Sequence, residues 1–182
     1  MSFPLFDLAG RRALITGSSQ GIGFALAEGL AAHGAEIVVN GRDVDKVEAA
    51  VAALRDSGHV ANAAAFDVTS RDAAAEAVGI IESEIGAIDI LINNAGMQFR
   101  SPLEDFPADK WEQLLATNIS SVFYVSQAVA RFNTQDADRA RAFLPELPYH
   151  AIWCRIGDPG NPGGHADAFA TSLALHLRPR FL

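Results

Sequence analysis

A glycine-rich turn between an apolar strand and a helix limits the possible folds of this chain more than any other feature. The turn spans residues 16–23 (TGSSQGIG), with a strand predicted at 12–16 and a helix at 21–33. Backbone N–H groups at a helix N-terminus bind phosphate when no side chains block the approach. We therefore expect a phosphate-binding loop. A plain turn is the alternative, and the strand–helix setting favours phosphate.

The three glycines of this turn have separate expected roles. Gly17 makes the tight turn after the strand, Gly21 lets the backbone approach the phosphates, and Gly23 lets the helix pack close to the sheet. Ser18 and Ser19 are expected to add hydroxyl donors. The residues expected to contact the ligand in this turn are Gly17, Ser18, Ser19, Gln20, Gly21, Ile22 and Gly23.

Apolar runs alternate with helical patterns through the first 131 residues. This alternation predicts an α/β fold, in which right-handed connections stack the units into one Rossmann-type, doubly wound parallel sheet. Ile22, Leu26 and Leu30 share one stripe of the first helix, and Leu115 and Ile119 fall at helical spacing in the last. The predicted strands span 12–16, 36–40, 60–66 and 88–92, and the predicted helices span 21–33, 44–55, 71–85 and 107–131.

The character of the sequence changes near residue 132, where Arg, Pro, His and Gly replace Ala, Val, Ile and Glu. We interpret residues 1–131 as a dinucleotide-binding Rossmann domain and residues 132–182 as a divergent tail, frame-shifted or irregular. Within the tail, a strand at 150–156 and a short helix at 166–177 flank a loop rich in Pro and Gly.

Composition narrows the classes of partner. The net charge is −8 with no block of Lys or Arg, which argues against nucleic acid or an anionic membrane as the main partner. No apolar run is long enough to span a bilayer and no leader pattern opens the chain, so a cytoplasmic protein is expected. Cys154 is the only cysteine. No metal is expected, because His150, His165 and His176 are too widely spaced.

Three features together resemble the short-chain dehydrogenase/reductase family: the TGxxxGIG turn, the segment 93–96 (NNAG) after the fourth predicted strand, and Asn118 in the next helix. The resemblance covers about residues 7–131 and is greatest to the gluconate 5-dehydrogenase branch, through the runs FDLAGR at 6–11 and NAGMQFR at 94–100. It implies a homo-oligomer. The later strands and interface elements of the family have no match here, so the sheet is expected to be incomplete at its C-terminal side.

The end of the second predicted strand distinguishes between nicotinamide cofactors. In NAD-dependent folds an acidic residue here binds the ribose diol. Gly41 falls at that place and Arg42 follows it. A guanidinium binds a 2′-phosphate in a forked geometry, and in the family an arginine here accompanies NADP(H). We therefore expect NADP rather than NAD. A solvated loop arginine, paired with Asp43, is the alternative.

The resemblance also implies the contacts to the adenosine. Asp67 follows the third predicted strand, where the family has an Asp that accepts from the adenine amino group with the backbone of Val68 close by. The less favoured alternative for Asp67 is a helix N-cap, which Thr69 and Ser70 also suit. The residues expected to close over the adenine ribose are Asn94, Ala95 and Gly96.

The catalytic set of the family is matched at one position. Hydride transfer to a carbonyl needs a proton donor, which in the family is a Tyr, assisted by a Lys one helical turn later, an upstream Ser and an Asn. Asn118 matches the Asn. Tyr149 is followed by Trp153 where Lys would stand, and no lysine occurs after Lys110. The family's spacing places Ser, Tyr and Lys at Glu146, Pro159 and Gly163.

Two functions therefore remain open. The first is a short-chain oxidoreductase that transfers a hydride between NADP(H) and an alcohol or ketone, with a small-molecule substrate such as a polyol or a sugar acid like gluconate. The second is a catalytically inactive nucleotide-binding or truncated chain. The tail is a frame-shifted end, a diverged end without catalysis, or a source of another acid such as Tyr149 or His150. Gln98, Phe99 and Arg100 line a substrate pocket or form an exposed loop.

Overall fold

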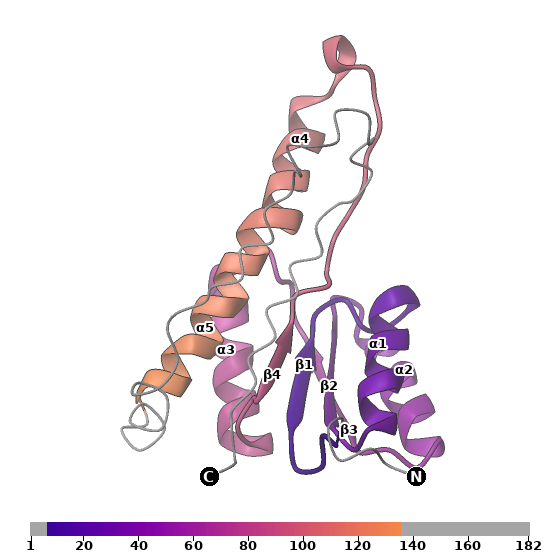
Figure 1. The fold of residues 1–182 in the computed structure, drawn as a ribbon. Helices are drawn as coiled ribbons and strands as arrows, with labels where there is room; N and C mark the ends of the chain where they lie inside the picture. The colour runs from indigo at the N-terminus through magenta and orange to yellow at the C-terminus, as the bar shows by residue number, and fades with distance from the viewer. Residues whose placement is uncertain (1–6, 136–182) are drawn as a thin grey trace, which may run out of the picture.

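The computed structural model describes residues 7–135, which form a parallel sheet covered by helices on both faces (Figure 1). The strand order is β3-β2-β1-β4. The predicted α/β class and all four predicted strands are confirmed. The strands are β1 (Arg12–Ile15), β2 (Glu36–Gly41), β3 (Ala61–Ala65) and β4 (Ile90–Ile92).

Helices α1 and α2 lie on one face of the sheet, and α3 and α5 lie on the other (Figure 1). Strand β1 serves both layers because successive side chains alternate between faces. Ala13 and Ile15 pack into the core beneath α1 and α2, whereas Leu14 packs with Val38 into the core beneath α3 and α5. The helices are α1 (Gly21–Ala32), α2 (Val44–Asp56), α3 (Arg71–Ile80), α4 (Ala108–Leu115) and α5 (Ser121–Gln135).

Helix α1 faces the sheet with its small residues. The structure buries Gly23, Ala27 and Ala31, while Ile22 is 76% exposed. The predicted stripe was therefore wrong at Ile22, and Leu30 is only partly buried against the core. Small side chains let the helix axis approach the sheet closely, so the larger apolar residues lie at the margins of the contact.

Two of the predicted helices end in, or contain, a π-helical turn. Helix α3 continues into η2 (Ile81–Ile85), and the predicted helix at 107–131 is divided by η4 (Ala116–Ser120) between α4 and α5. A π turn adds a residue to the helical repeat and rotates the later face. Before this turn, Leu114 is buried and Leu115 is only partly buried, and within the turn Ile119 is exposed.

The helical rod from α4 to α5 extends well beyond the sheet (Figure 1). A short 3-10 turn, η3 (Leu103–Asp105), precedes it. Among the described helices, none combines the length and apolar character needed to cross a bilayer. The strand and helix predicted at 150–156 and 166–177 lie outside the described residues.

Replacing Gly23 by alanine tests the close packing of α1. A Cβ on Gly23 would collide with the carbonyl oxygen of Gly17 and lie 2.5 Å from Nδ2 of Asn94. Overpacking of this kind costs about 1–3 kcal/mol. We expect Gly23→Ala to lower the free energy of unfolding by that amount in a urea titration followed by circular dichroism.

The matched control is Gly29→Ala in the same helix, where a Cβ would meet no atom within 4 Å. Alanine is favoured over glycine inside a helix by about 1 kcal/mol, so this variant should be slightly more stable than the wild type. Equal effects of the two substitutions would contradict the packing argument.

Candidate functional site

The carboxyl ends of the four strands bring the candidate residues to one edge of the sheet. In doubly wound sheets, ligands bind in the crevice outside this edge. The glycine turn follows β1, Arg42 follows β2, Asp67 follows β3 and the segment 93–96 follows β4. The fold therefore places the cofactor residues expected from sequence on neighbouring strand ends.

The glycine turn has the backbone that the sequence predicted. Gly17 and Gly21 have φ angles of +64° and +61°, which other L-residues adopt rarely. A Cβ on Gly17 would lie 3.0 Å from Cα of Ala95, whereas one on Gly21 would meet no atom within 4 Å. Gly17 is thus needed for close packing as well as for the turn. The open space beside Gly21 leaves room for a phosphate to reach the backbone.

The first turn of α1 also fits an anion. Gln20 is the N-cap residue, and its side chain makes no hydrogen bond to the helix. The N–H groups of the first helical turn have no carbonyl partner within a helix. Gln20, Gly21 and Ile22 are exposed there. The helix N-terminus therefore presents N–H donors and the positive end of its dipole at the carboxyl edge of the sheet.

Ser18 differs from its expected role. Its hydroxyl donates to the carbonyl of Ile15 at 2.7 Å and accepts from the N–H of Asn40 at 3.1 Å, and the residue has no exposed surface. The Ser18 hydroxyl is committed to the protein, so the expectation of a donor to the ligand was wrong there. Ser19, which is partly exposed, keeps that expected role.

Asn40, at the end of β2, is a site residue that sequence reasoning missed. It is 1% exposed. Its Oδ1 accepts from the N–H of Gly17 at 3.2 Å, and its Nδ2 donates to the carbonyls of Ala64 at 3.0 Å and Phe66 at 3.2 Å. The available signal was a polar residue at the end of the apolar run Ile-Val-Val in β2.

The segment 93–96 is fastened to the glycine turn. The N–H groups of Asn94 and Ala95 donate to Oγ1 of Thr16 at 2.9 and 3.0 Å. Nδ2 of Asn94 donates to the carbonyls of Thr16 at 3.0 Å and Gly17 at 3.2 Å. The amide group of Asn94 therefore supports the glycine turn. Its neighbour Gly96 is exposed.

Arg42 is exposed and makes no hydrogen bond or ion pair with other residues of the described range 7–135. The alternative pairing with Asp43 is not observed. Asp43 instead caps α2, accepting from the N–H of Lys46 at 3.2 Å, and its other oxygen lies 3.6 Å from Nζ of Lys46. The guanidinium of Arg42 is therefore available to an anionic ligand.

Asp67 is held in a tight local turn rather than at the helix N-cap. Its Oδ1 accepts from the N–H of Thr69 at 2.9 Å and from the Thr69 hydroxyl at 2.7 Å. The N-cap of α3 is Ser70, which accepts from the N–H of Ala73 at 3.3 Å. Val68 is buried in the core beneath α3 and α5. The N-cap alternative for Asp67 is therefore wrong.

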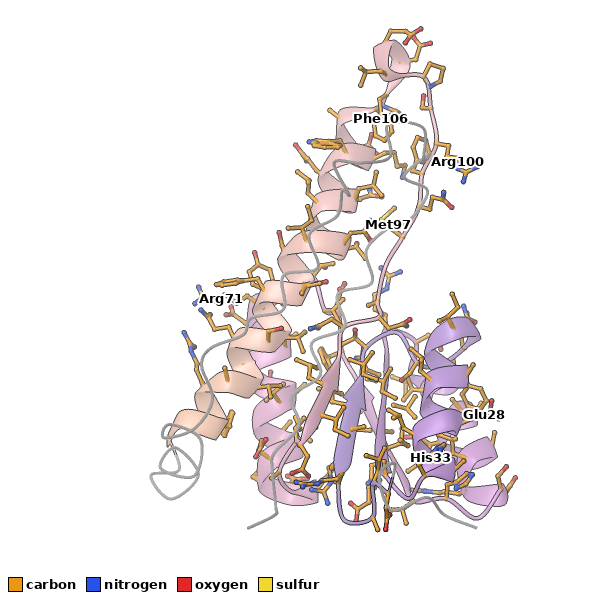
Figure 2. All side chains as sticks on the ribbon, viewed as in Figure 1. Glu28, His33, Arg71, Met97, Arg100 and Phe106 are labelled. Atoms are coloured by element: carbon orange, nitrogen blue, oxygen red, sulfur yellow. The ribbon has the colours of Figure 1, made fainter. Side chains whose placement is uncertain are left out.

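Asn118 lies in the π-helical turn η4 and forms a reciprocal pair with the backbone of Met97. The N–H of Met97 donates to Oδ1 of Asn118 at 2.8 Å, and Nδ2 of Asn118 donates to the Met97 carbonyl at 3.0 Å. Figure 2 shows Met97, Arg100 and Phe106 along the segment that leads from β4 to α4. The side chain of Asn118 thus holds the start of this segment against the helix.

The other candidates cannot be placed relative to the strand ends. Tyr149, His150 and the remaining tail histidines lie outside the described residues, as do the positions reached by the family's spacing. Across residues 7–135, no group of three or more His, Cys, Asp or Glu side chains is arranged to hold a metal ion.

Comparison with known proteins identifies the family. The family profile described as "short chain dehydrogenase" matches residues 11–139. The chain therefore belongs to the short-chain dehydrogenase family.

Two similar curated proteins belong by name to the gluconate branch of this family. The chain is 52% identical over 132 residues to gluconate 5-dehydrogenase of Gluconobacter oxydans, covering 72% of this chain and 52% of that protein. It is 50% identical over 127 residues to 5-keto-D-gluconate 5-reductase of Escherichia coli K12, covering 70% and 50%. The chain thus spans about half the length of the curated relatives that it matches.

Solved structures agree with this likeness. A gluconate 5-dehydrogenase from Burkholderia cenocepacia, in complex with NADP and tartrate, has a TM-score of 0.70 and 47% identity over 75% of this chain and 52% of its own. L-Sorbose reductase from Gluconobacter frateurii, complexed with NADPH and L-sorbose, has a TM-score of 0.66 and 31% identity, covering 72% and 49%.

Removing the Asn118 amide tests its hold on the segment after β4. We expect Asn118→Ala to free the Met97 N–H and to lower the free energy of unfolding by about 1–2 kcal/mol, since two hydrogen bonds are lost. Amide hydrogen exchange should accelerate at Met97. The control is Asn62→Ala in β3, whose side chain makes no hydrogen bond to other described residues. Unchanged exchange at Met97 would contradict this role.

Proposed function

We propose that this chain provides the cofactor-binding part of an NADP-linked oxidoreductase that interconverts a hydroxyl group and a ketone on a sugar acid such as gluconate. The observation that supports this most directly is the likeness to a gluconate 5-dehydrogenase whose structure contains NADP. A small-molecule substrate, a cytoplasmic location and self-association as a homo-oligomer belong to the same proposal.

The residues present suit such a cofactor. The glycine turn and the first turn of α1 would hold the pyrophosphate, Arg42 the 2′-phosphate, and Asp67 with the backbone of Val68 the adenine. Asn94, Ala95 and Gly96 would lie along the adenine ribose. When bound, the nicotinamide donates or accepts the hydride. Asn118 would keep the segment after β4 in place beside it.

The surroundings of Gly41 favour NADP over NAD. A Cβ on Gly41 would lie 2.9 Å from Oγ of Ser19 and 3.0 Å from Cγ2 of Val47. An acidic side chain, which NAD-dependent folds use at this place, would therefore require both neighbours to move. Arg42, directly after it, supplies a cation without an internal partner in the described part of the chain. Both features favour a cofactor with a 2′-phosphate.

A fluorescence titration of the 182-residue chain with NADPH, and with NADH for comparison, tests the cofactor assignment. Saturable binding that prefers NADPH is expected. A second assay follows the absorbance of NADPH with 5-keto-gluconate, and of NADP⁺ with gluconate. Absence of binding to either nucleotide would refute the proposed function of this chain.

A cofactor-binding chain without turnover is the second candidate. The observation that favours it is the sequence itself, since no lysine follows Lys110 and Tyr149 is not followed by Lys at the family's spacing. It predicts NADPH binding without any change in NADPH absorbance in either direction of the assay. Measurable turnover would reject it.

Arg42→Ala separates the two cofactors. Loss of a charged hydrogen-bond partner costs about 1.5–3 kcal/mol, so the dissociation constant for NADPH should rise about tenfold to a hundredfold. The constant for NADH should stay the same, because NADH has no 2′-phosphate.

Lys46→Ala is the control for this experiment, because Lys46 is a neighbouring cation that already pairs with Asp43. It should change neither constant by more than about twofold, because exposed charges interact weakly. An equal loss of NADPH and NADH affinity in Arg42→Ala would contradict the assignment of Arg42 to the 2′-phosphate.

A further inference from the structure

We propose that Asn40 is a positioning residue that couples the pyrophosphate side of the cofactor site to its adenine side. The inference rests on the proposed function, because it concerns the affinity for the same cofactor. Asn40 is 1% exposed, so it acts through its neighbours rather than by touching the ligand.

The side chain of Asn40 joins two loops that approach the cofactor from different strands. Its Oδ1 accepts from the N–H of Gly17 in the glycine turn at 3.2 Å. Its Nδ2 donates in the other direction, to the carbonyls of Ala64 at 3.0 Å and Phe66 at 3.2 Å. Phe66 directly precedes Asp67, so this bond fixes the chain where the adenine-side segment begins.

The backbone of Asn40 extends the same connection. Its carbonyl accepts from the N–H of Ser18 at 2.8 Å, and its N–H donates to Oγ of Ser18 at 3.1 Å. The Ser18 hydroxyl in turn donates to the carbonyl of Ile15, the last residue of β1. Through one residue, the ends of β1, β2 and β3 become a single hydrogen-bonded unit.

A carboxamide is the side chain that this position requires. One acceptor must face Gly17 and two N–H donors must face the carbonyls of Ala64 and Phe66, and a carboxamide carries this combination on a short stem. Aspartate has the same shape but no donors when ionised. Leucine fills the space but would leave the N–H of Gly17 and the two carbonyls without this partner, at a cost in a buried setting.

The connection predicts a specific pattern of binding. The pyrophosphate and the adenine are common to NADPH and NADH, whereas the 2′-phosphate belongs to NADPH alone. Disturbing Asn40 should therefore weaken both cofactors by a similar factor. Arg42, by contrast, is expected to affect NADPH only. This difference separates the role of Asn40 from that of the phosphate-binding cation.

Asn40→Asp in the 182-residue chain tests the proposal, with NADPH and NADH titrations from about pH 8 to about pH 6. At the higher pH the new carboxylate faces two carbonyls, and both dissociation constants should rise about tenfold or more. Burial raises the pKa of such a carboxyl, and its protonation restores one donor as the pH falls. The ratio of variant to wild-type dissociation constants should therefore shrink toward the acidic end.

The charged residues that follow in the chain do not interfere with the measured pH dependence of the dissociation constants. Arg42 comes two residues after Asn40 and Asp67 comes directly after Phe66, and neither makes a hydrogen bond or ion pair to Asn40. The control is Asn62→Asp, which makes the same chemical change in β3, at a side chain that bonds to no other described residue. It should leave both constants and their pH dependence as in the wild type.

Three results would overturn the role of Asn40. They are unchanged binding in Asn40→Asp, an equal loss in Asn62→Asp, or a loss confined to NADPH. A merely structural role would lower the melting temperature while the folded molecules kept wild-type affinity and no added pH dependence. A wild-type chain that bound neither nucleotide would instead defeat the proposed function, and the inference with it.

Ser18→Ala is the second variant, which keeps the proposal falsifiable if Asn40→Asp does not fold. It removes the hydroxyl that links the Asn40 N–H to the end of β1 but leaves the Asn40 carboxamide in place. Both dissociation constants should rise about fivefold, as expected for one lost hydrogen-bond link. Wild-type affinity in a folded Ser18→Ala variant would count against the coupling.

Discussion

The pairing of buried polar groups where the parallel strands end is the constraint on which the rest of this structure depends. A crevice at the carboxyl edge must stay open for a ligand, yet the backbone that lines it must find hydrogen-bond partners. Short polar side chains meet both needs here, because they make their hydrogen bonds within the protein. They are Thr16, Ser18, Asn40, Asn93 and Asn94, of which all but Asn94 are buried. These hydrogen bonds also reach helix α5, because Nδ2 of Asn93 donates to the hydroxyl of Ser126 at 3.0 Å.

Local pattern predicted the elements of this fold well and their contacts less well. Alternating apolar runs placed four strands and the glycine turn, because strand burial and helix initiation leave their marks within a few residues. The buried face of α1 was predicted wrongly, because a helix that lies close to a sheet has glycine and alanine at the contact. A search for large apolar residues at helical spacing does not detect such a face. Asn40 was missed for another reason, since its partners lie 22 to 26 residues away and leave no local spacing.

The proposed cofactor contacts and the positions matching the family's catalytic set fall in separate stretches of this chain. Every proposed nucleotide contact falls between Gly17 and Gly96, on strand ends that the described fold already brings together. Of the family's catalytic set, only Asn118 lies in the described region, and its side chain is occupied in holding Met97. The proposed nucleotide contacts thus come from one group of residues, separate from those that would transfer the proton.

The spans of these hydrogen bonds also imply an order of assembly during synthesis. The bonds of Asn40 close loops of 22 to 26 residues, whereas those joining Thr16 to Asn94 and Ala95 close loops of 78 and 79. Shorter loops cost less entropy to close, and a chain leaves the ribosome N-terminus first. Three strand ends can therefore be tied together before β4 has left the ribosome. The nascent chain would reach β4 with a template already formed, against which the last part of the crevice docks.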